Sequence, residues 1–296
     1  MKLCRFNGGR LGMLDPERNT LVDVSVVYDQ IAPRRYPFPR EDVFIAALPG
    51  LREPIREAAK WGEEFALCAV KLDSPVANPG KIMGAPVNYE DHAVEGRKDP
   101  GIASGRQIPS IGDWGMFLKA GSSLVGFGGE ISLRFADRRN DHELELGVVI
   151  ADTCTQVSRS DAMKHVAGYC IALDMTLRGT EFQCFRKSID SYSVLGPWLV
   201  TADEIENPGA LDLELKVNGV VRQKSNTRHL IYDVPRLIEF ASSFYTLNAG
   251  DVIMTGTPAG VGPVKPGDRL DMWIEKVGSG TVWIAPNYAS SDHVAE

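Results

Sequence analysis

Most of the chain beyond residue 75 consists of short apolar segments separated by glycine and proline, and this pattern limits the folds open to it. Segments such as LELGVVIA, GPWLVTA and LDLELKVNG have the length and composition of β-strands. Convincing helical patterns are few there, SRSDAMKHVAGYC (158–170) and DVPRLIEFASSFYT (233–246). A doubly wound sheet needs helices and strands in alternation, so the sequence predicts a mainly β fold with a few helices, of the α+β class.

The N-terminal part of the chain has a different pattern. Alternating apolar and polar residues in LGMLDPERNTLVDVS predict a hairpin that turns at Asp15-Pro16, and residues 51–70 predict an amphipathic helix. The stretch LDSPVANPGK, with two prolines and a glycine, indicates a connection. We therefore expect a small N-terminal α+β domain over 1–74, a catalytic domain over 75–285 and a tail over 286–296.

Charge and cysteine content exclude several classes of function. The 296 residues carry a net charge of −7 and show no basic cluster with interleaved aromatic residues, so we expect no nucleic-acid partner. No uninterrupted apolar stretch has the length needed to cross a bilayer, so we expect no membrane partner. The five cysteines are odd in number and lack close metal-type spacing, which indicates reduced thiols in a cytoplasmic protein.

The stretch RRNDHELELGVVI carries two acidic residues next to an apolar run. If it is a strand, Glu143 and Glu145 project to the same side, because side chains alternate faces along a strand. Two carboxylates in one small volume repel each other unless a proton or a cation lies between them. The alternative is a solvated face on an edge strand, where charged residues deter aggregation.

Asp174 lies inside the apolar run GYCIALDMTLRG, where its carboxylate would be buried. A buried carboxylate needs a cation, a set of hydrogen bonds or a proton, and Arg178 is one candidate as its ion-pair partner. Glu143, Glu145 and Asp174 together form an all-oxygen set of ligands. Such ligands favour Mg²⁺ or Mn²⁺, with Ca²⁺ as a further candidate, over Zn²⁺.

Three further stretches carry residues that are able to act on a substrate. In VNYEDHAVEG, His92 and Glu95 share one face if the segment is helical, as a general base held by a carboxylate would; the alternative is an exposed helical pair. Lys187 precedes an apolar run, either at the rim of a pocket or as an ordinary surface lysine. The glycines of TGTPAGVG allow backbone N–H groups to approach an anion, with the hydroxyl of Thr257 beside them, unless this is a plain turn.

The order of these stretches resembles the fumarylacetoacetate hydrolase family. KIMGAPVNYEDHAVE, DHELELGVVI, GYCIALDMTLRG, FRKSIDSYSVLGPWLVT and DVIMTGTPAGVG follow one another as in that family, over roughly residues 75–285. The resemblance implies a mixed β-sandwich roll of the fumarylacetoacetase C-terminal-domain type, preceded by a small N-terminal domain. It also implies a homodimer.

The resemblance implies roles for particular residues. It makes Glu143, Glu145 and Asp174 the ligands of a divalent metal, and it places His92 and Glu95 on a segment that closes over the substrate. Catalytic roles follow for His92, Glu95 and Lys187. Contacts to a 2-oxo acid substrate follow for Arg178, Thr257, Gly256 and Tyr89.

The chain also departs from the family pattern. After Asp174 the sequence LRGTEFQCFRKS differs from the usual sequence of the family. Glu181 or Gln183 therefore takes the place of a glutamine that is common in the family. The segment 105–123 is longer than a minimal member requires, which bears on the shape of the acyl-side pocket.

These features together predict a metal-dependent enzyme that hydrolyses a C–C bond in a 2,4-dioxo acid such as an acylpyruvate or fumarylpyruvate, with water activated by His92 and Glu95. The alternative reactions use the same site for decarboxylation, isomerisation or hydration of a 2-oxo acid. A non-catalytic metal-binding protein would keep the three acidic residues but have no use for His92.

Overall fold

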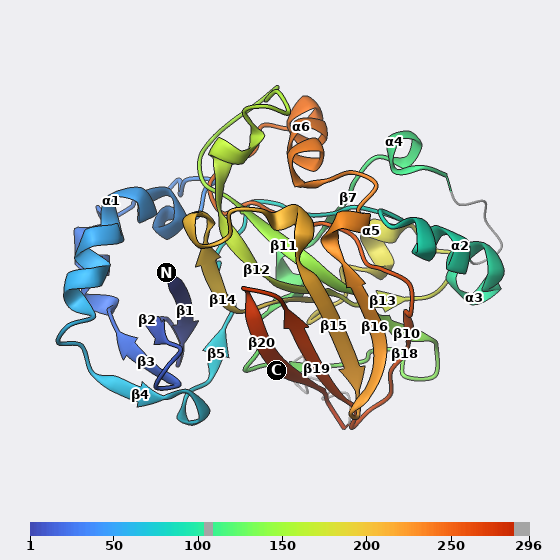
Figure 1. Cartoon of the computed structure of the whole chain (residues 1–296), viewed down its shortest axis with the longest axis horizontal. Coiled ribbons are helices and arrows are strands. Elements are labelled where there is room, and N and C mark those ends of the chain that lie inside the picture. Colours follow the sequence, from blue (N-terminus) through green and yellow to red (C-terminus); the bar gives the residue numbers. More distant parts are fainter. Residues whose placement is uncertain (104–108, 287–296) are drawn as a thin grey trace, which may run out of the picture.

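The chain folds as a mainly β structure with few helices, as its sequence predicts (Figure 1). The computed structural model describes residues 1–103 and 109–286. Of the predicted C-terminal tail, residues 287–296 lie outside the described part of the chain. The helices are α1 (Val43–Ala58), α2 (Glu90–Lys98), α3 (Pro100–Ala103), α4 (Ile111–Trp114), α5 (Gln183–Arg186) and α6 (Val234–Phe244).

The largest sheet contains twelve strands. They are β1 (Lys2–Phe6), β2 (Arg10–Asp15), β3 (Thr20–Asp23), β4 (Glu64–Ala66), β5 (Leu72–Asp73), β6 (Ile82–Gly84), β7 (Phe117–Lys119), β8 (Leu124–Val125), β11 (Leu144–Ile150), β12 (Val166–Asp174), β14 (Ser193–Thr201) and β17 (Val252–Met254). The main path runs β4-β3-β2-β1-β14-β12-β11-β17-β6-β7, while β5 pairs with β1 and β8 with β14. The strands β12 and β11 therefore lie at its centre, each paired on both sides.

Two smaller sheets complete the fold. A five-stranded sheet has the order β16-β15-β19-β20-β9, and a three-stranded sheet has the order β13-β10-β18. The strands are β9 (Glu130–Ile131), β10 (Asn140–His142), β13 (Thr176–Leu177), β15 (Asp212–Val217), β16 (Val220–Asn226), β18 (Gly262–Pro263), β19 (Arg269–Ile274) and β20 (Gly278–Ile284). The turn signal VNGV lies between β15 and β16, which pair antiparallel as a hairpin.

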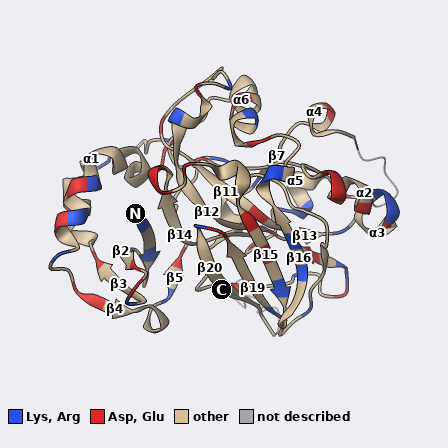
Figure 2. Ribbon diagram, in the orientation of Figure 1, with Lys and Arg blue, Asp and Glu red and all other residues tan. Residues whose placement is uncertain are grey.

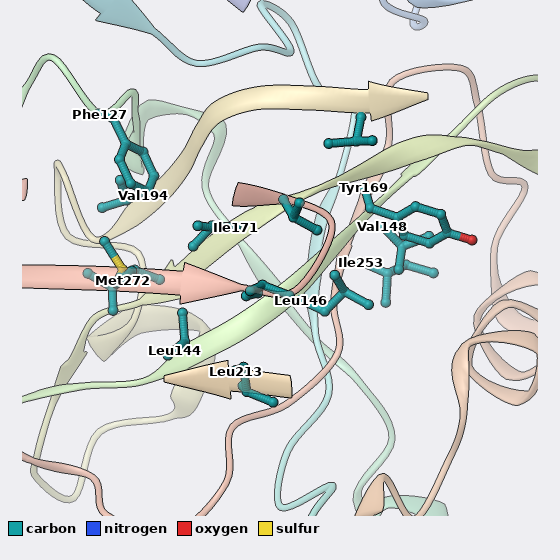
Figure 3. Packing of buried hydrophobic residues seen from close by; sticks show 14 of the residues in the cluster. Phe127, Leu144, Leu146, Val148, Tyr169, Ile171, Val194, Leu213, Ile253 and Met272 are labelled. Carbon is teal, nitrogen blue, oxygen red and sulfur yellow. The ribbon is translucent and has the colours of Figure 1, made fainter. Parts of the chain in front are cut away.

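The core lies between the twelve-stranded and the five-stranded sheets (Figure 3). Leu144 and Leu146 of β11 are buried there in one cluster with Leu213 of β15 and Met272 of β19. Because side chains alternate along a strand, Glu145 projects from the opposite face of the same sheet. The apolar residues of β11 thus fix the direction in which its acidic residues point.

The N-terminal segment extends the large sheet. The predicted hairpin is confirmed as β2 and β3, with Leu14 opposite Leu21, and β1 pairs antiparallel with β14, with Leu3 opposite Leu199. On the outer face of the sheet, α1 packs in a second apolar cluster together with Leu199. The large sheet therefore contains strands from both sides of residue 75, and the division into two domains stays a prediction.

Two predicted helices differ from the structure. The helix expected over 51–70 is α1, which begins after Asp42 and ends at Ala58, before β4. Its early start is set by the Asp42 carboxylate, which accepts hydrogen bonds from the N–H groups of Phe44 and Ile45. The helix expected over 158–170 is wrong: a short 3₁₀ turn is followed by β12, because β11 and β14 supply backbone partners on both sides. The helix expected over 233–246 is confirmed as α6.

Charged residues of both signs are interspersed along the chain, and both occur on α1 (Figure 2). Within residues 1–103 and 109–286, no helix is long and apolar enough to span a bilayer. Of the five cysteines, Cys68 and Cys184 are exposed, and all five are free thiols.

Candidate metal centre and active site

The three predicted metal ligands meet at the centre of the large sheet. Glu143 immediately precedes β11, Glu145 lies on it, and Asp174 ends the neighbouring β12. One carboxylate oxygen from each lies within 4.8 Å of the others, and all three side chains are buried. Since β11 is paired on both sides and Glu145 is only 2% exposed, the edge-strand alternative is excluded.

Buried cations hold two of these carboxylates. The ammonium of Lys187 donates to Glu143 Oε2 and to Asp174 Oδ2, both at 2.6 Å, and to the hydroxyl of Thr176 at 2.7 Å. Arg178 Nη2 donates to Glu143 Oε1 at 2.8 Å. Arg178 is therefore the partner of Glu143 and not of Asp174, and Lys187 points into the protein and is not an ordinary surface lysine.

A second lysine at this site escaped the sequence analysis. Lys119, at the end of β7, is buried and donates to Asp174 Oδ1 and to the backbone oxygen of Tyr192, the latter at 2.8 Å. Burial lowers the pKa of Lys119, against the opposing influence of Asp174. It lies 55 residues before its partner in the chain, so no local pattern identifies it.

The charges around the three carboxylates are compatible with a bound cation. Burial alone would raise the pKa of Glu143, but the charges of Lys187 and Arg178 hold that pKa below its ordinary value. Burial and the neighbouring carboxylates of Asp174 and Glu143 raise the pKa of Glu145 well above its ordinary value. Among the described residues Glu145 forms no ion pair, and it accepts a hydrogen bond from the N–H of Gly256 at 2.6 Å. Three carboxylates that supply only oxygen atoms, one of them without an ion-pair partner among the described residues, fit a hard divalent ion.

His92 and Glu95 form the predicted pair on α2. His92 Nδ1 lies 2.9 Å from Glu95 Oε2, and the other oxygen of Glu95 accepts the N–H of Gly260 at 2.9 Å. His92 is 6% exposed, so the pair is not a surface pair. Because a carboxylate accepts and does not donate, the neutral imidazole of His92 carries its proton on Nδ1 and has its free lone pair on Nε2.

A cavity of about 230 Å³ joins the pair to the carboxylates. Seven of the ten predicted site residues line it: His92, Glu143, Glu145, Asp174, Arg178, Lys187 and Thr257. The aromatic side chains of Trp114 and Phe117 also line it, from the segment expected to shape the acyl-side pocket. Gln183 lines the cavity as well, whereas Glu181 is hydrogen-bonded to Arg138 at 2.8 Å and lines a neighbouring cavity. Of Glu181 and Gln183, it is thus Gln183 that faces the site.

The other three predicted residues, Glu95, Tyr89 and Gly256, lie behind the cavity wall. Glu95 acts on His92, as described above. Gly256 faces Glu145 through its N–H and has a φ of 95°, a conformation that favours glycine. Tyr89 is 2% exposed and precedes α2. These three residues therefore support the side chains that line the cavity and do not line it themselves.

Gln223 is a second residue that sequence analysis missed. Its amide group accepts the N–H of Leu144 at 3.0 Å and donates to the Thr257 hydroxyl at 2.7 Å. The Thr257 hydroxyl in turn donates to the backbone oxygen of Leu144 at 2.9 Å. Gln223 therefore ties the start of β11, between the two glutamates, to the loop after β17.

Comparison with known proteins agrees with this geometry. A family model described as fumarylacetoacetate (FAA) hydrolase C-terminal matches residues 81–283. A maleylpyruvate hydrolase of Aquipseudomonas alcaligenes is 50% identical over 286 residues, which cover 96% of this chain and 99% of that protein. A 2,4-didehydro-3-deoxy-L-rhamnonate hydrolase of Sphingomonas sp. (strain SKA58) is 41% identical over 297 residues, covering 94% of each.

A solved structure is similar over nearly the whole chain. Maleylpyruvate hydrolase from Sphingobium sp. SYK-6, in complex with manganese(II) and pyruvate, has a TM-score of 0.82 at 38% identity and covers 96% of this chain and 99% of that one. The chain therefore belongs to the fumarylacetoacetate hydrolase family.

Proposed function

We propose that this protein is a divalent-metal-dependent hydrolase that cleaves a C–C bond in an acylpyruvate. The observation that carries the proposal is the joint placement of three buried carboxylates and a His–Glu pair around one cavity. The carboxylates would hold Mg²⁺ or Mn²⁺. When bound, such an ion acts as a Lewis acid and a template for the oxygens of a 2-oxo acid.

The residues of the chain would move the proton and balance the charge. His92 Nε2 takes a proton from water, and the resulting hydroxide oxygen bonds to the 4-carbonyl carbon of the substrate. The C3–C4 bond then breaks, its electron pair enters the pyruvate fragment as the enolate, and protonation at C3 gives pyruvate and a carboxylic acid. Lys187 lines the cavity, but its N–H groups already have three partners, so it stabilises developing negative charge by its field.

The relatives support the reaction class. The maleylpyruvate hydrolase that is 50% identical takes a substrate of acylpyruvate type by its name, and the SYK-6 structure carries manganese(II) and pyruvate, a product expected of such a cleavage. Structures described as isomerases are more distant, at 26–28% identity and TM-scores of 0.69–0.76. Hydrolysis is therefore favoured over isomerisation.

Product analysis tests the proposal. The Mn²⁺-loaded protein is incubated with acetylpyruvate, fumarylpyruvate, maleylpyruvate and oxaloacetate, with and without chelator. Hydrolysis yields pyruvate plus a carboxylic acid from an acylpyruvate, and chelator abolishes it. Release of CO₂ from oxaloacetate without any acylpyruvate cleavage would identify a decarboxylase instead. Cleavage that is unchanged in His92→Ala would remove that residue from the mechanism.

We also propose a cytoplasmic homodimer. Free thiols fit a reducing compartment. Three exposed apolar side chains, Leu118, Phe135 and Phe185, surround a cavity of about 650 Å³ that Cys184 also lines, and a second copy of the chain would cover it. Light scattering should give twice the mass of the chain, and iodoacetamide should label Cys68 faster than Cys184. A monomer, or equal labelling of the two exposed thiols, would refute this interface.

A further inference from the structure

We infer that Arg139 is a positioning residue that couples the metal-ligating carboxylate of Glu143 to the helix carrying His92 and Glu95. The inference rests on the proposed function for its kinetic part. Four hydrogen-bonded ion pairs join the two parts of the site through side chains that are not metal ligands. Nothing in the mechanism above assigns a role to these residues.

The chain of contacts begins at the metal nest. Glu143 Oε1 accepts from Arg178 Nη2 at 2.8 Å, and Arg178 Nε donates to Asp141 Oδ2 at 2.7 Å. The other oxygen of Asp141 accepts from Arg139 Nε at 2.8 Å, and Arg139 Nη1 donates to Asp99 Oδ2 at 2.8 Å. The side chains of Asp141 and Arg178 are 0% and 7% exposed, so solvent weakens their contact little. Arg139 and Asp99 are 28% and 37% exposed, so the last contact is partly open to solvent.

The chain of contacts ends on the catalytic helix. Asp99 directly follows α2, and its N–H donates to the backbone oxygen of Glu95 at 2.9 Å. Its carboxylate also accepts the N–H of Gly101 at 2.8 Å. The position of Asp99 therefore sets the last turn of α2, which carries Glu95, and Glu95 in turn orients His92.

The surroundings of Gly101 show how closely Arg139 and Asp99 pack. A Cβ atom at Gly101 would lie 2.5 Å from Arg139 Nη1 and 3.0 Å from Asp99 Oδ1. A side chain there would displace the guanidinium, which is the mobile end of a flexible residue. Glycine at position 101 thus leaves the space that the guanidinium of this ion pair occupies, which is a second observation pointing to the same contact.

Arginine suits this role because its planar group binds two carboxylates at once. Arg139 contacts Asp141 through Nε and Asp99 through Nη1, so a shift of Glu143 and Arg178 on metal binding is passed to Asp99. An interaction with only one of these carboxylates would break this side-chain path between the metal nest and α2. We therefore expect the order of α2 to respond to metal through Arg139.

Hydrogen–deuterium exchange of the full-length protein, with Mn²⁺ alone as the ligand, tests the coupling. In the unmodified protein Mn²⁺ should slow exchange at residues 90–98, and Arg139→Gln should lose this effect while its Mn²⁺ affinity stays within about threefold. Gly101→Ala should reproduce the loss without removing a charge, and it replaces Arg139→Gln should the latter fail to fold. Arg56→Gln is the matched control, because it removes an exposed ion pair with Glu53 on α1, which does not line the cavity.

Kinetics supply the second arm. Arg139→Gln should lower kcat about tenfold or more with little change in KM, because misplacement of the base affects the chemical step. In a His92→Ala background the same substitution should have no further effect, since both act through one helix. A full additional loss of kcat in that background would overturn the inference. It would also be overturned if Mn²⁺ failed to slow exchange of α2 in the unmodified protein, or if Mn²⁺ still slowed it in Arg139→Gln. Absence of hydrolysis by the unmodified protein would refute the proposed function and leave the exchange result readable.

Discussion

Replacement of Lys119 by Met tests how the buried carboxylates are stabilised. The substitution keeps an unbranched apolar side chain but removes the ammonium that contacts Asp174 and the backbone oxygen of Tyr192. Both side chains of the ion pair are fully buried, at 0% exposure each. Asp174 then keeps Lys187 as its remaining ion-pair partner among the described residues.

The magnitude follows from two opposing effects. Removing one partner of a buried ion pair typically costs about 3–5 kcal/mol, because the other charge stays buried. Burial already lowers the pKa of Lys119, so its removal also relieves a desolvation penalty, and Lys187 compensates in part. We therefore expect a loss near the lower end, about 3 kcal/mol, or roughly 6 °C in Tm for a protein of this size.

The assay is thermal or urea unfolding of the metal-free and Mn²⁺-loaded protein. Mn²⁺ should stabilise Lys119→Met more than the unmodified protein, because the ion supplies the charge that the ammonium supplied. Lys60→Met is the matched control, since Lys60 lies just after α1, is exposed and pairs with the exposed Glu57; the stability of this variant should not change. A loss below about 1 kcal/mol for Lys119→Met, or an equal gain from Mn²⁺ in both proteins, would refute the reasoning.

Three further predictions concern metal binding, the loss of stability at low pH and the shape of the cavity. Glu143→Gln should bind less Mn²⁺ by elemental analysis, since an amide is a weaker ligand than a carboxylate; full occupancy would exclude Glu143 as a ligand. Burial would raise the pKa of Asp203, but hydrogen bonds from Thr201 and Arg52 outweigh it and lower this pKa from 3.8 to about 2. The stability from this group is therefore present above its unfolded pKa and lost as pH falls between these values. In urea unfolding, Asp203→Asn should reduce the change of unfolding free energy with pH across that window, and an unchanged slope would contradict this. Gly84→Ala places a Cβ 2.1 Å from the ring of Phe117, so it should raise KM by pushing the ring into the cavity while metal content stays unchanged; an unaltered KM would contradict that.

The parts of the site that sequence predicts are those with a local pattern. Glu143 and Glu145 stand two residues apart beside apolar neighbours, and that spacing predicts a common side for both if the segment is a strand. In the structure Glu145 lies on β11 and Glu143 directly precedes it. Asp174 is conspicuous as a carboxylate in an apolar run, and the structure buries it completely. The pair of His92 and Glu95 is visible from helical spacing, and α2 confirms the helix.

The parts that sequence does not predict depend on contacts between distant segments. Lys119 reaches Asp174 across 55 residues, and Gln223 reaches Leu144 across 79. The helix expected over 158–170 failed for the same reason: its apolar residues also suit a central strand, and the partner strands β11 and β14 decide the outcome. Pairing with strands on both sides outweighs the local helix propensity of such a segment.

The loop after β17 joins the two functional parts of the site a second time. The N–H of Gly256 binds Glu145, which has no ion-pair partner among the described residues, while the N–H of Gly260 binds Glu95, the partner of the proposed general base His92. Between them, the Thr257 hydroxyl binds the backbone that lies between the two glutamates. Three residues of this loop therefore contact the two parts of the site, Gly256 and Gly260 through their backbone N–H groups and Thr257 through its side chain. Because Arg139 joins these parts by side chains and this loop by backbone, loss of Arg139 is expected to impair their alignment while leaving the metal nest itself assembled.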